Sequence, residues 1–169
     1  MVLSGRFGLW LMPEAGVRDA LQSQIAGLAR EYGTVPFEPH VTLLGGIPDQ
    51  AALTAPLASL AAQVGTMTVR LGDIRYQCEY FRCLYIEIKP DAALVRARDL
   101  ARSLFGGAPA GPFEPHVSLL YGDMPEELKG AIAARLSDRV PRTMRLERLA
   151  LYDLAGRPDT WSAIDARAL

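Results

Sequence analysis

The chain has 169 residues, half of them apolar, and a formal net charge of -1. This length suffices for one domain with a substantial core, and the near-neutral charge argues against a broad surface for long nucleic acids. No apolar stretch is long enough to cross a membrane, and the N-terminal run GLWLM is too short for a signal peptide. Two cysteines do not make a disulfide framework, so we expect a cytoplasmic protein.

The first half of the chain alternates strands with helices. A strand is expected over residues 6–12 and an amphipathic helix over 14–31, ended by Gly33. The next strand contains His40 and closes at Gly45-Gly46. A second helix is expected over 49–64, with Asp49 as its N-cap and a kink at Pro56. Strands at 66–74 and 80–89 follow, and the second of these has the alternation of a half-buried strand.

The second half repeats this order. A helix is expected over 91–105, capped by Asp91, and the glycine- and proline-rich loop at 106–113 is the best candidate for a mobile segment. A further strand contains His116, and a helix over 124–139 precedes strands at 142–154 and 160–168. This pattern predicts an α+β fold of two pseudo-symmetric lobes, each an antiparallel sheet with helices outside. We expect one bilobal domain over residues 1–169, with an active-site cleft between the lobes.

One stretch occurs twice. Residues 36–44 read PFEPHVTLL and residues 112–120 read PFEPHVSLL, so the copies differ only at Thr42 and Ser118. The two histidines of the chain, His40 and His116, occupy the same place in each copy. Because strand side chains alternate between faces, each histidine shares a face with the hydroxyl two residues later. Copies facing each other would surround one space with two imidazoles and two hydroxyls.

That arrangement suits a phosphodiester and requires no metal or other cofactor. An imidazole near its usual pKa of about 6.5 can accept a proton from water or give one to a leaving alkoxide. The hydroxyls can hydrogen-bond the phosphoryl oxygens. Two alternatives remain: structural histidines, or a zinc site, which would need a third ligand that no nearby Cys or His supplies. Glu38 and Glu114 could support the histidines, unless the prolines beside them break the alternation.

The paired His-x-Thr/Ser motifs resemble those of the two-histidine phosphoesterases. Within that superfamily, residues 7–14, 80–88, 114–123 and 148–153, with a late DTW at 159–161, resemble the plant- and yeast-type cyclic phosphodiesterases. The resemblance implies hydrolysis of ADP-ribose 1″,2″-cyclic phosphate to ADP-ribose 1″-phosphate, with nucleoside 2′,3′-cyclic phosphates as poorer substrates. It implies a role in RNA metabolism and a small-molecule partner. We expect a monomer with neither membrane nor long nucleic acid as partner.

The resemblance also implies further site residues. Tyr121 would contact the phosphate, although ideal strand alternation turns it away from the histidines. Trp10 would either pack in the core or stack on a nucleobase, and Phe81 or Tyr80 would border the pocket. We assign His116 as base and His40 as acid, although the near-identical motifs cannot order these roles.

Three questions stay open. Cys78 and Cys83 could be bridged, but free thiols are the default in a reducing compartment. An RNA-end 2′,3′-cyclic phosphodiesterase or ligase-like enzyme of the same superfamily would show a basic groove leading away from the histidines. The second functional alternative is a non-catalytic module that binds cyclic phosphates. The intact hydroxyls beside both histidines argue against it.

Overall fold

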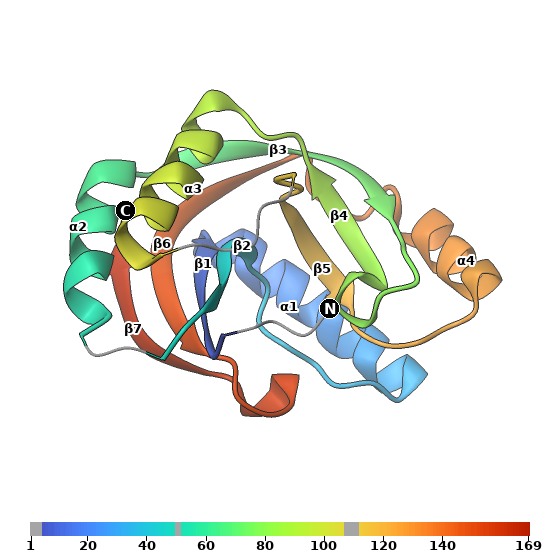
Figure 1. Cartoon of the computed structure of the whole chain (residues 1–169). Coiled ribbons are helices and arrows are strands. Elements are labelled where there is room, and N and C mark those ends of the chain that lie inside the picture. Colours follow the sequence, from blue (N-terminus) through green and yellow to red (C-terminus); the bar gives the residue numbers. More distant parts are fainter. Residues whose placement is uncertain (1–4, 50–51, 107–111) are drawn as a thin grey trace.

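The computed structural model describes residues 5–49, 52–106 and 112–169 (Figure 1). The strands of this part of the chain are β1 (Phe7–Pro13), β2 (Val41–Ile47), β3 (Met67–Arg75), β4 (Leu84–Ile88), β5 (His116–Leu120), β6 (Thr143–Asp153) and β7 (Ser162–Ala168). The helices are α1 (Ala15–Tyr32), α2 (Thr54–Val64), α3 (Ala92–Phe105) and α4 (Glu126–Leu136). The predicted α+β class, with antiparallel strands and outer helices, is confirmed.

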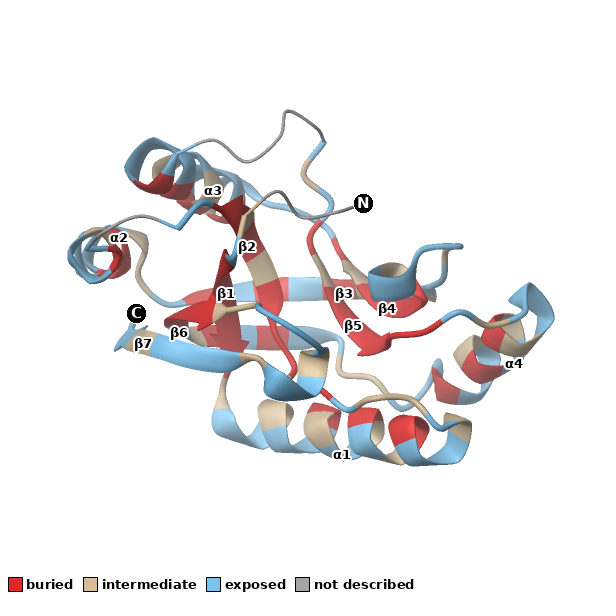
Figure 2. Ribbon diagram, turned by 60° about the horizontal axis from the view of Figure 1, so that its bottom comes forward, coloured by how far each residue is buried: buried red, intermediate tan, exposed pale blue. Residues whose placement is uncertain are grey.

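The strands form one sheet in the order β1-β2-β5-β4-β3-β6-β7, in which β1 also pairs with β6. The long strand β6 connects the two lobes: its first residues pair with β3, and its remainder pairs with β1 and β7. The two predicted sheets are therefore halves of one sheet. The helices divide between the halves, with α2 and α3 packed on β2, β6 and β7, and α1 and α4 on β1, β3 and β5 (Figures 1 and 2).

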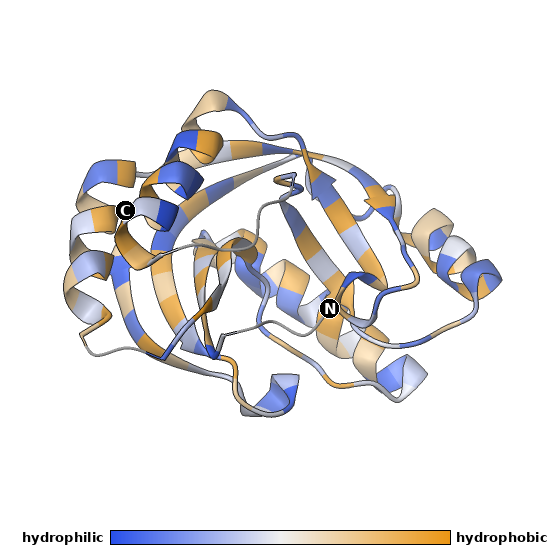
Figure 3. Cartoon of the chain, in the orientation of Figure 1, coloured by the Kyte–Doolittle hydropathy of each residue, from blue (hydrophilic) through white to orange (hydrophobic). Residues whose placement is uncertain are grey.

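The two copies of the repeat meet where β2 and β5 pair. Val41 pairs with Val117 in antiparallel register. That register sets His40 across from Ser118, and Thr42 across from His116. Val41, Leu43, Val117 and Leu119 are fully buried in the aliphatic core, on the strand faces opposite the histidines. Hydrophobic and hydrophilic residues alternate along β4 and β6, and both kinds occur around the helices (Figure 3). Burial of the aliphatic face thus holds both histidine motifs toward each other.

Local signals explain where several elements begin and end. The Asp91 side chain accepts a hydrogen bond from the Leu94 amide and starts α3, as predicted. Gly33, in the left-handed conformation at φ 66°, ends α1. Asp49 does not cap α2, which begins at Thr54 after Leu53. Pro56 therefore lies in the first turn, where its missing N–H costs no intrahelical bond and no kink is required.

Other predicted boundaries are also wrong. The strand expected to contain His40 and to close at Gly45-Gly46 begins at Val41 and ends at Ile47. Residues 80–82 form a 3-10 turn, so the strand expected from residue 80 begins at Leu84. That strand is buried on both faces except at Glu87, because it lies between β3 and β5. A second 3-10 turn over Pro158–Thr160 delays β7 to Ser162, and α4 spans only Glu126–Leu136. Most of the glycine- and proline-rich loop, residues 107–111, lies outside the described residues.

Candidate active site

The two imidazoles are held in the same way. His40 Nδ1 lies 2.6 Å from the Glu38 carbonyl oxygen, and His116 Nδ1 lies 2.9 Å from the Glu114 carbonyl oxygen. A carbonyl oxygen can only accept, so each neutral ring donates its proton through Nδ1. The lone pair is then on Nε2 in both rings. The repeat PFEPH thus builds two equivalent bases, each oriented by the main chain of its own motif.

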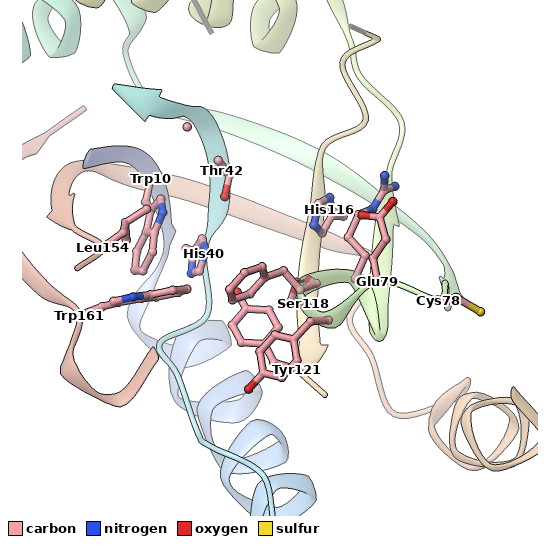
Figure 4. A pocket seen from close by; sticks show the side chains of 14 residues that line it. Trp10, His40, Thr42, Cys78, Glu79, His116, Ser118, Tyr121, Leu154 and Trp161 are labelled. Carbon is pink, nitrogen blue, oxygen red and sulfur yellow. Dashed lines mark hydrogen bonds between the residues drawn. The ribbon is translucent and has the colours of Figure 1, made fainter. Parts of the chain in front are cut away.

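All seven residues predicted for the site line one cavity of about 450 Å³, called here the main cavity (Figure 4). They are Trp10, His40, Thr42, Phe81, His116, Ser118 and Tyr121. The two histidines come from the two halves of the sheet, as the pseudo-symmetric arrangement requires. The main cavity is also lined by residues that sequence reasoning left out, and among these Arg82 and Trp161 bear on function.

His40 is buried beneath aromatic rings. The Trp10 ring stacks on its imidazole, with centroids 3.5 Å apart and planes 4° from parallel (Figure 4). Burial lowers the pKa of His40 to about 3, and the neighbouring His116 adds to that lowering. The second face of Trp10 is covered by Tyr152 at 3.8 Å. Both faces of the indole are therefore occupied in this structure, and neither is open to a nucleobase.

Glu38 connects this stack to the His40 motif. Its carboxylate accepts a hydrogen bond from the Tyr152 hydroxyl, while its main-chain carbonyl accepts from His40. Burial and the adjacent carboxylate raise the pKa of Tyr152, so its hydroxyl remains a donor. Glu38 thus supports His40 twice, once through its backbone and once through the ring stack.

His116 has different surroundings. It is less buried than His40 and meets the Tyr85 ring edge-on, with centroids 5.1 Å apart. Arg82 Nη1 donates to the Glu114 carboxylate at 2.7 Å, and the guanidinium carbon lies 4.9 Å from the centre of the Tyr85 ring. Burial lowers the pKa of His116 below 6.5, and the positive charge of Arg82 lowers it further. Two nearly identical motifs therefore hold histidines in unlike environments.

The hydroxyl groups and Tyr121 complete the polar lining. Ser118 Oγ donates to the Phe81 carbonyl oxygen at 3.0 Å, which ties β5 to the 3-10 turn of residues 80–82. Strand β5 ends at Leu120, so Tyr121 escapes strand alternation and lines the main cavity. Burial raises the pKa of Tyr121, and its ring stacks on Phe37 at 3.7 Å. The phenol is therefore a fixed, protonated group.

Aromatic rings form the outer wall. Phe81 is 40% exposed, and Trp161 lies opposite it with ring centroids 5.8 Å apart. The indole nitrogen of Trp161 is buried and has no hydrogen-bond partner among the described residues. The DTW motif at residues 159–161 pointed to Trp161 in the sequence, whereas nothing in the sequence separated Arg82 from the other basic residues. Only the folded structure shows that both residues line the main cavity.

The two cysteines do not form a disulfide with each other. Cys78 and Cys83 are free thiols in the structure: Cys78 is exposed and lines the main cavity, and Cys83 is buried. Burial raises the pKa of Cys83, which makes its thiolate unfavourable. Within residues 5–49, 52–106 and 112–169, no group of three or more His, Cys, Asp or Glu side chains could hold a metal ion. None of the helices in these ranges has an apolar stretch of the length that a membrane span requires.

The sequence model of the family "Cyclic phosphodiesterase-like protein" matches residues 6–162. The chain belongs to this family. It is 24% identical over 154 residues to the cyclic phosphodiesterase of Arabidopsis thaliana, covering 86% of this chain and 83% of the plant protein. It is therefore a phosphoesterase of the cyclic phosphodiesterase family.

Solved structures agree with this family at the level of the fold. Escherichia coli LigT, crystallised with ATP, superposes with a TM-score of 0.60 at 18% identity, covering 98% of this chain and 97% of LigT. The protein TT0787 of Thermus thermophilus gives a TM-score of 0.61 at 18% identity, covering 97% of each chain. The two-lobed arrangement is thus shared with these proteins.

Proposed function

We propose that this cyclic phosphodiesterase opens the ring of ADP-ribose 1″,2″-cyclic phosphate to give ADP-ribose 1″-phosphate, with nucleoside 2′,3′-cyclic phosphates as secondary substrates. One observation carries the proposal: two imidazoles from opposite halves of the sheet line one cavity, each oriented through Nδ1 and each with a hydroxyl beside it. The activity named for the Arabidopsis relative supports cyclic phosphate hydrolysis.

The lower pKa of His40 supports one order of the two catalytic roles. The working enzyme needs one neutral imidazole and one imidazolium. Because the pKa of His40 is about 3 and that of His116 is less strongly depressed, the singly protonated pair has its proton mainly on His116. We therefore reverse the assignment made from the sequence: His40 is the base and His116 is the acid. The negative charge of a bound phosphodiester further favours the imidazolium.

The reaction then follows from the positions of these groups. His40 Nε2 removes a proton from a water molecule, whose oxygen forms a bond to phosphorus. The bond from phosphorus to O2″ breaks, and the His116 imidazolium donates its proton to that oxygen. Thr42 and Ser118 donate hydrogen bonds to the phosphoryl oxygens, where charge develops. Ser118 must release the Phe81 carbonyl to do so.

The remainder of the substrate fits the aromatic wall. With both faces of Trp10 covered, the rings of Tyr80, Phe81 and Trp161, which also line the main cavity, can contact an adenine base. Stacking on such rings tolerates different bases. The structures of LigT with ATP and with 3′-AMP support an adenine nucleotide as the ligand class.

Phosphorus NMR of EDTA-treated protein tests this function. We expect the cyclic phosphate resonance of ADP-ribose 1″,2″-cyclic phosphate to be replaced by that of a phosphomonoester, and a nucleoside 2′,3′-cyclic phosphate to react more slowly. Turnover restored only by added metal would mean that the histidines are ligands and would overturn the mechanism. Binding without turnover would identify a sensing module, and a preference for cyclic-phosphate RNA ends would identify an RNA-end enzyme.

A further inference from the structure

A second cavity adjoins the main cavity on the His116 side. It measures about 280 Å³ and its lining includes Gln77, Tyr85, Lys89 and Glu114. Arg82 lines both cavities. Among the described residues that line the main cavity, Arg82 is the one with a permanent positive charge. A ligand held between the histidines can therefore reach this guanidinium from the main cavity, and the second cavity continues beyond it.

The guanidinium is positioned but retains unused donors. It makes one short bond to Glu114 and a longer contact of 3.4 Å to the Tyr85 hydroxyl, out of five N–H groups. Its Nε is buried without a partner in the part of the chain that the structure describes. An unpaired buried donor is unfavourable, and an anionic oxygen entering nearby would offer an acceptor after a small shift. The Arg82 side chain is 20% exposed, so it is accessible to a ligand.

The wall behind Arg82 is braced by a buried lysine. Lys129 of α4 is 2% exposed, and its ammonium donates to the Gln77 carbonyl oxygen at 2.8 Å. The main-chain N–H of Gln77 donates to the Arg82 carbonyl oxygen, and the side-chain Nε2 of Gln77 donates to the Tyr85 hydroxyl. The main chain of Arg82 is thus fixed from the core. A ligand group meets a preorganised guanidinium, which limits the entropy lost on binding.

Glu114 can give way to a ligand. Its side chain is 56% exposed, so its carboxylate can turn into water when an anion approaches Arg82. A phosphate group offers the guanidinium fork at least as good a partner, because two of its oxygens can accept in parallel. Lys89 and Glu87 line the same cavity and their charges offset each other, so Arg82 is the group on which an anion would depend.

We propose that Arg82, with the second cavity, is a subsite for a second phosphoryl group of the substrate, separate from the phosphate that is hydrolysed. This rests on the proposed function and deepens it. The subsite selects cyclic phosphates that carry an additional phosphate or pyrophosphate, as ADP-ribose derivatives do, over nucleoside cyclic phosphates with a free 5′-hydroxyl. Arg82 is thus a specificity-determining residue.

Two substrates that differ by one group test the subsite. The probes are adenosine 2′,3′-cyclic phosphate and the same compound with a 5′-diphosphate. We expect the wild-type protein to favour the diphosphate at least about tenfold in kcat/KM, mostly through KM, as expected for a charge-assisted contact. Arg82→Ala should remove this preference while lowering kcat/KM for the 5′-hydroxyl substrate much less. Arg82→Lys should restore only part of it, because a lysine lacks the planar fork.

Two further variants control for general effects. Glu114→Gln weakens the competing ion pair and should keep or increase the preference. Arg145→Ala, which removes another arginine paired with a glutamate at 4.0 Å, should leave it unchanged. Equal losses for both substrates in Arg82→Ala, or no preference in the wild type, would overturn the subsite. Calorimetry with ADP separates the two hypotheses: absent turnover with ADP binding that depends on Arg82 would refute the proposed function and support the subsite.

Discussion

The two copies of the histidine motif show how neighbours can differentiate identical sequences. In the first copy, Glu38 accepts from a neutral phenol, and His40 lies buried under Trp10. In the second copy, Glu114 pairs with Arg82, and His116 is partly exposed beside Tyr85. The peptide carbonyls fix both rings in the same way, so the difference comes from other strands. A duplicated motif thus places two histidines in the same local geometry, and their unequal burial supports the unequal roles that we propose for them.

Replacing either histidine is the strongest way to break this comparison. His40→Ala and His116→Ala should each lower kcat for the cyclic phosphate by about 10²- to 10⁴-fold, the usual contribution of general acid-base catalysis. An aryl phosphodiester, whose leaving group needs no proton, should separate the two variants. His116→Ala should keep most of its activity on the aryl ester, and His40→Ala should not. The opposite pattern would reinstate His116 as the base.

The two hydroxyls should also differ. Thr42→Ala and Ser118→Ala each remove a donor to the phosphoryl group, and each should lower kcat by up to about 10²-fold. Ser118→Ala also removes the bond to the Phe81 carbonyl, which frees the turn of residues 80–82. We therefore expect KM to rise more in Ser118→Ala than in Thr42→Ala. Steady-state kinetics on one substrate give this comparison, and equal KM values would argue against the coupling.

The pH dependence of kcat/KM reports both environments. The base must be neutral, which holds above the His40 pKa of about 3, and the acid must be protonated, which holds below the His116 pKa. Because the pKa of His116 is lower than 6.5, the optimum should lie between about 3 and 6.5. Activity should then fall about tenfold per pH unit on the alkaline side. An optimum above pH 7 would contradict the lowered pKa of His116.

Stability should depend on pH through His40 more than through His116. The unfolded chain protonates His40 near pH 6.5, and the folded chain does so only near pH 3. Unfolding therefore takes up a proton in this window, and stability falls by about 1.4 kcal/mol per pH unit as the pH decreases. His40→Gln should flatten the slope measured by urea unfolding. His116→Gln is the matched control and should flatten it over a narrower range, and identical slopes for the two variants would contradict the burial difference.

The smallest effect is expected from the tyrosines that support each motif. Tyr152→Phe removes a hydrogen bond to the Glu38 carboxylate and should lower the free energy of unfolding by about 1.5 kcal/mol. Tyr85→Phe removes contacts from Gln77 and Arg82 and should cost about 1 kcal/mol. Nitrogen-15 NMR should show the His40 ring perturbed by the first change and the His116 ring by the second. Perturbation of both rings by either change would mean that the two environments are not independent.

The secondary structure and the paired histidine motifs could be predicted from the sequence, because the patterns that indicate them lie within short stretches of the chain. Residues 36–44 and 112–120 match almost completely, and alternation sets histidine and hydroxyl on one face and valine and leucine on the other. Helical spacing and caps such as Asp91 and Gly33 located most helices. The predicted strand boundaries were wrong where a few residues can form either a strand or a turn, as at the 3-10 turns that precede β4 and β7.

Only the tertiary structure decided what surrounds each motif. Trp10 was compatible with core packing or with base stacking until Tyr152 and His40 were found on its two faces. Arg82 was one of many basic residues until the 3-10 turn set it beside His116 and Glu114. The proposed order of acid and base rests on burial, which is a property of the packed chain. The sequence by itself predicted the candidate reacting groups and their pairing, and long-range packing gave the two histidines different surroundings.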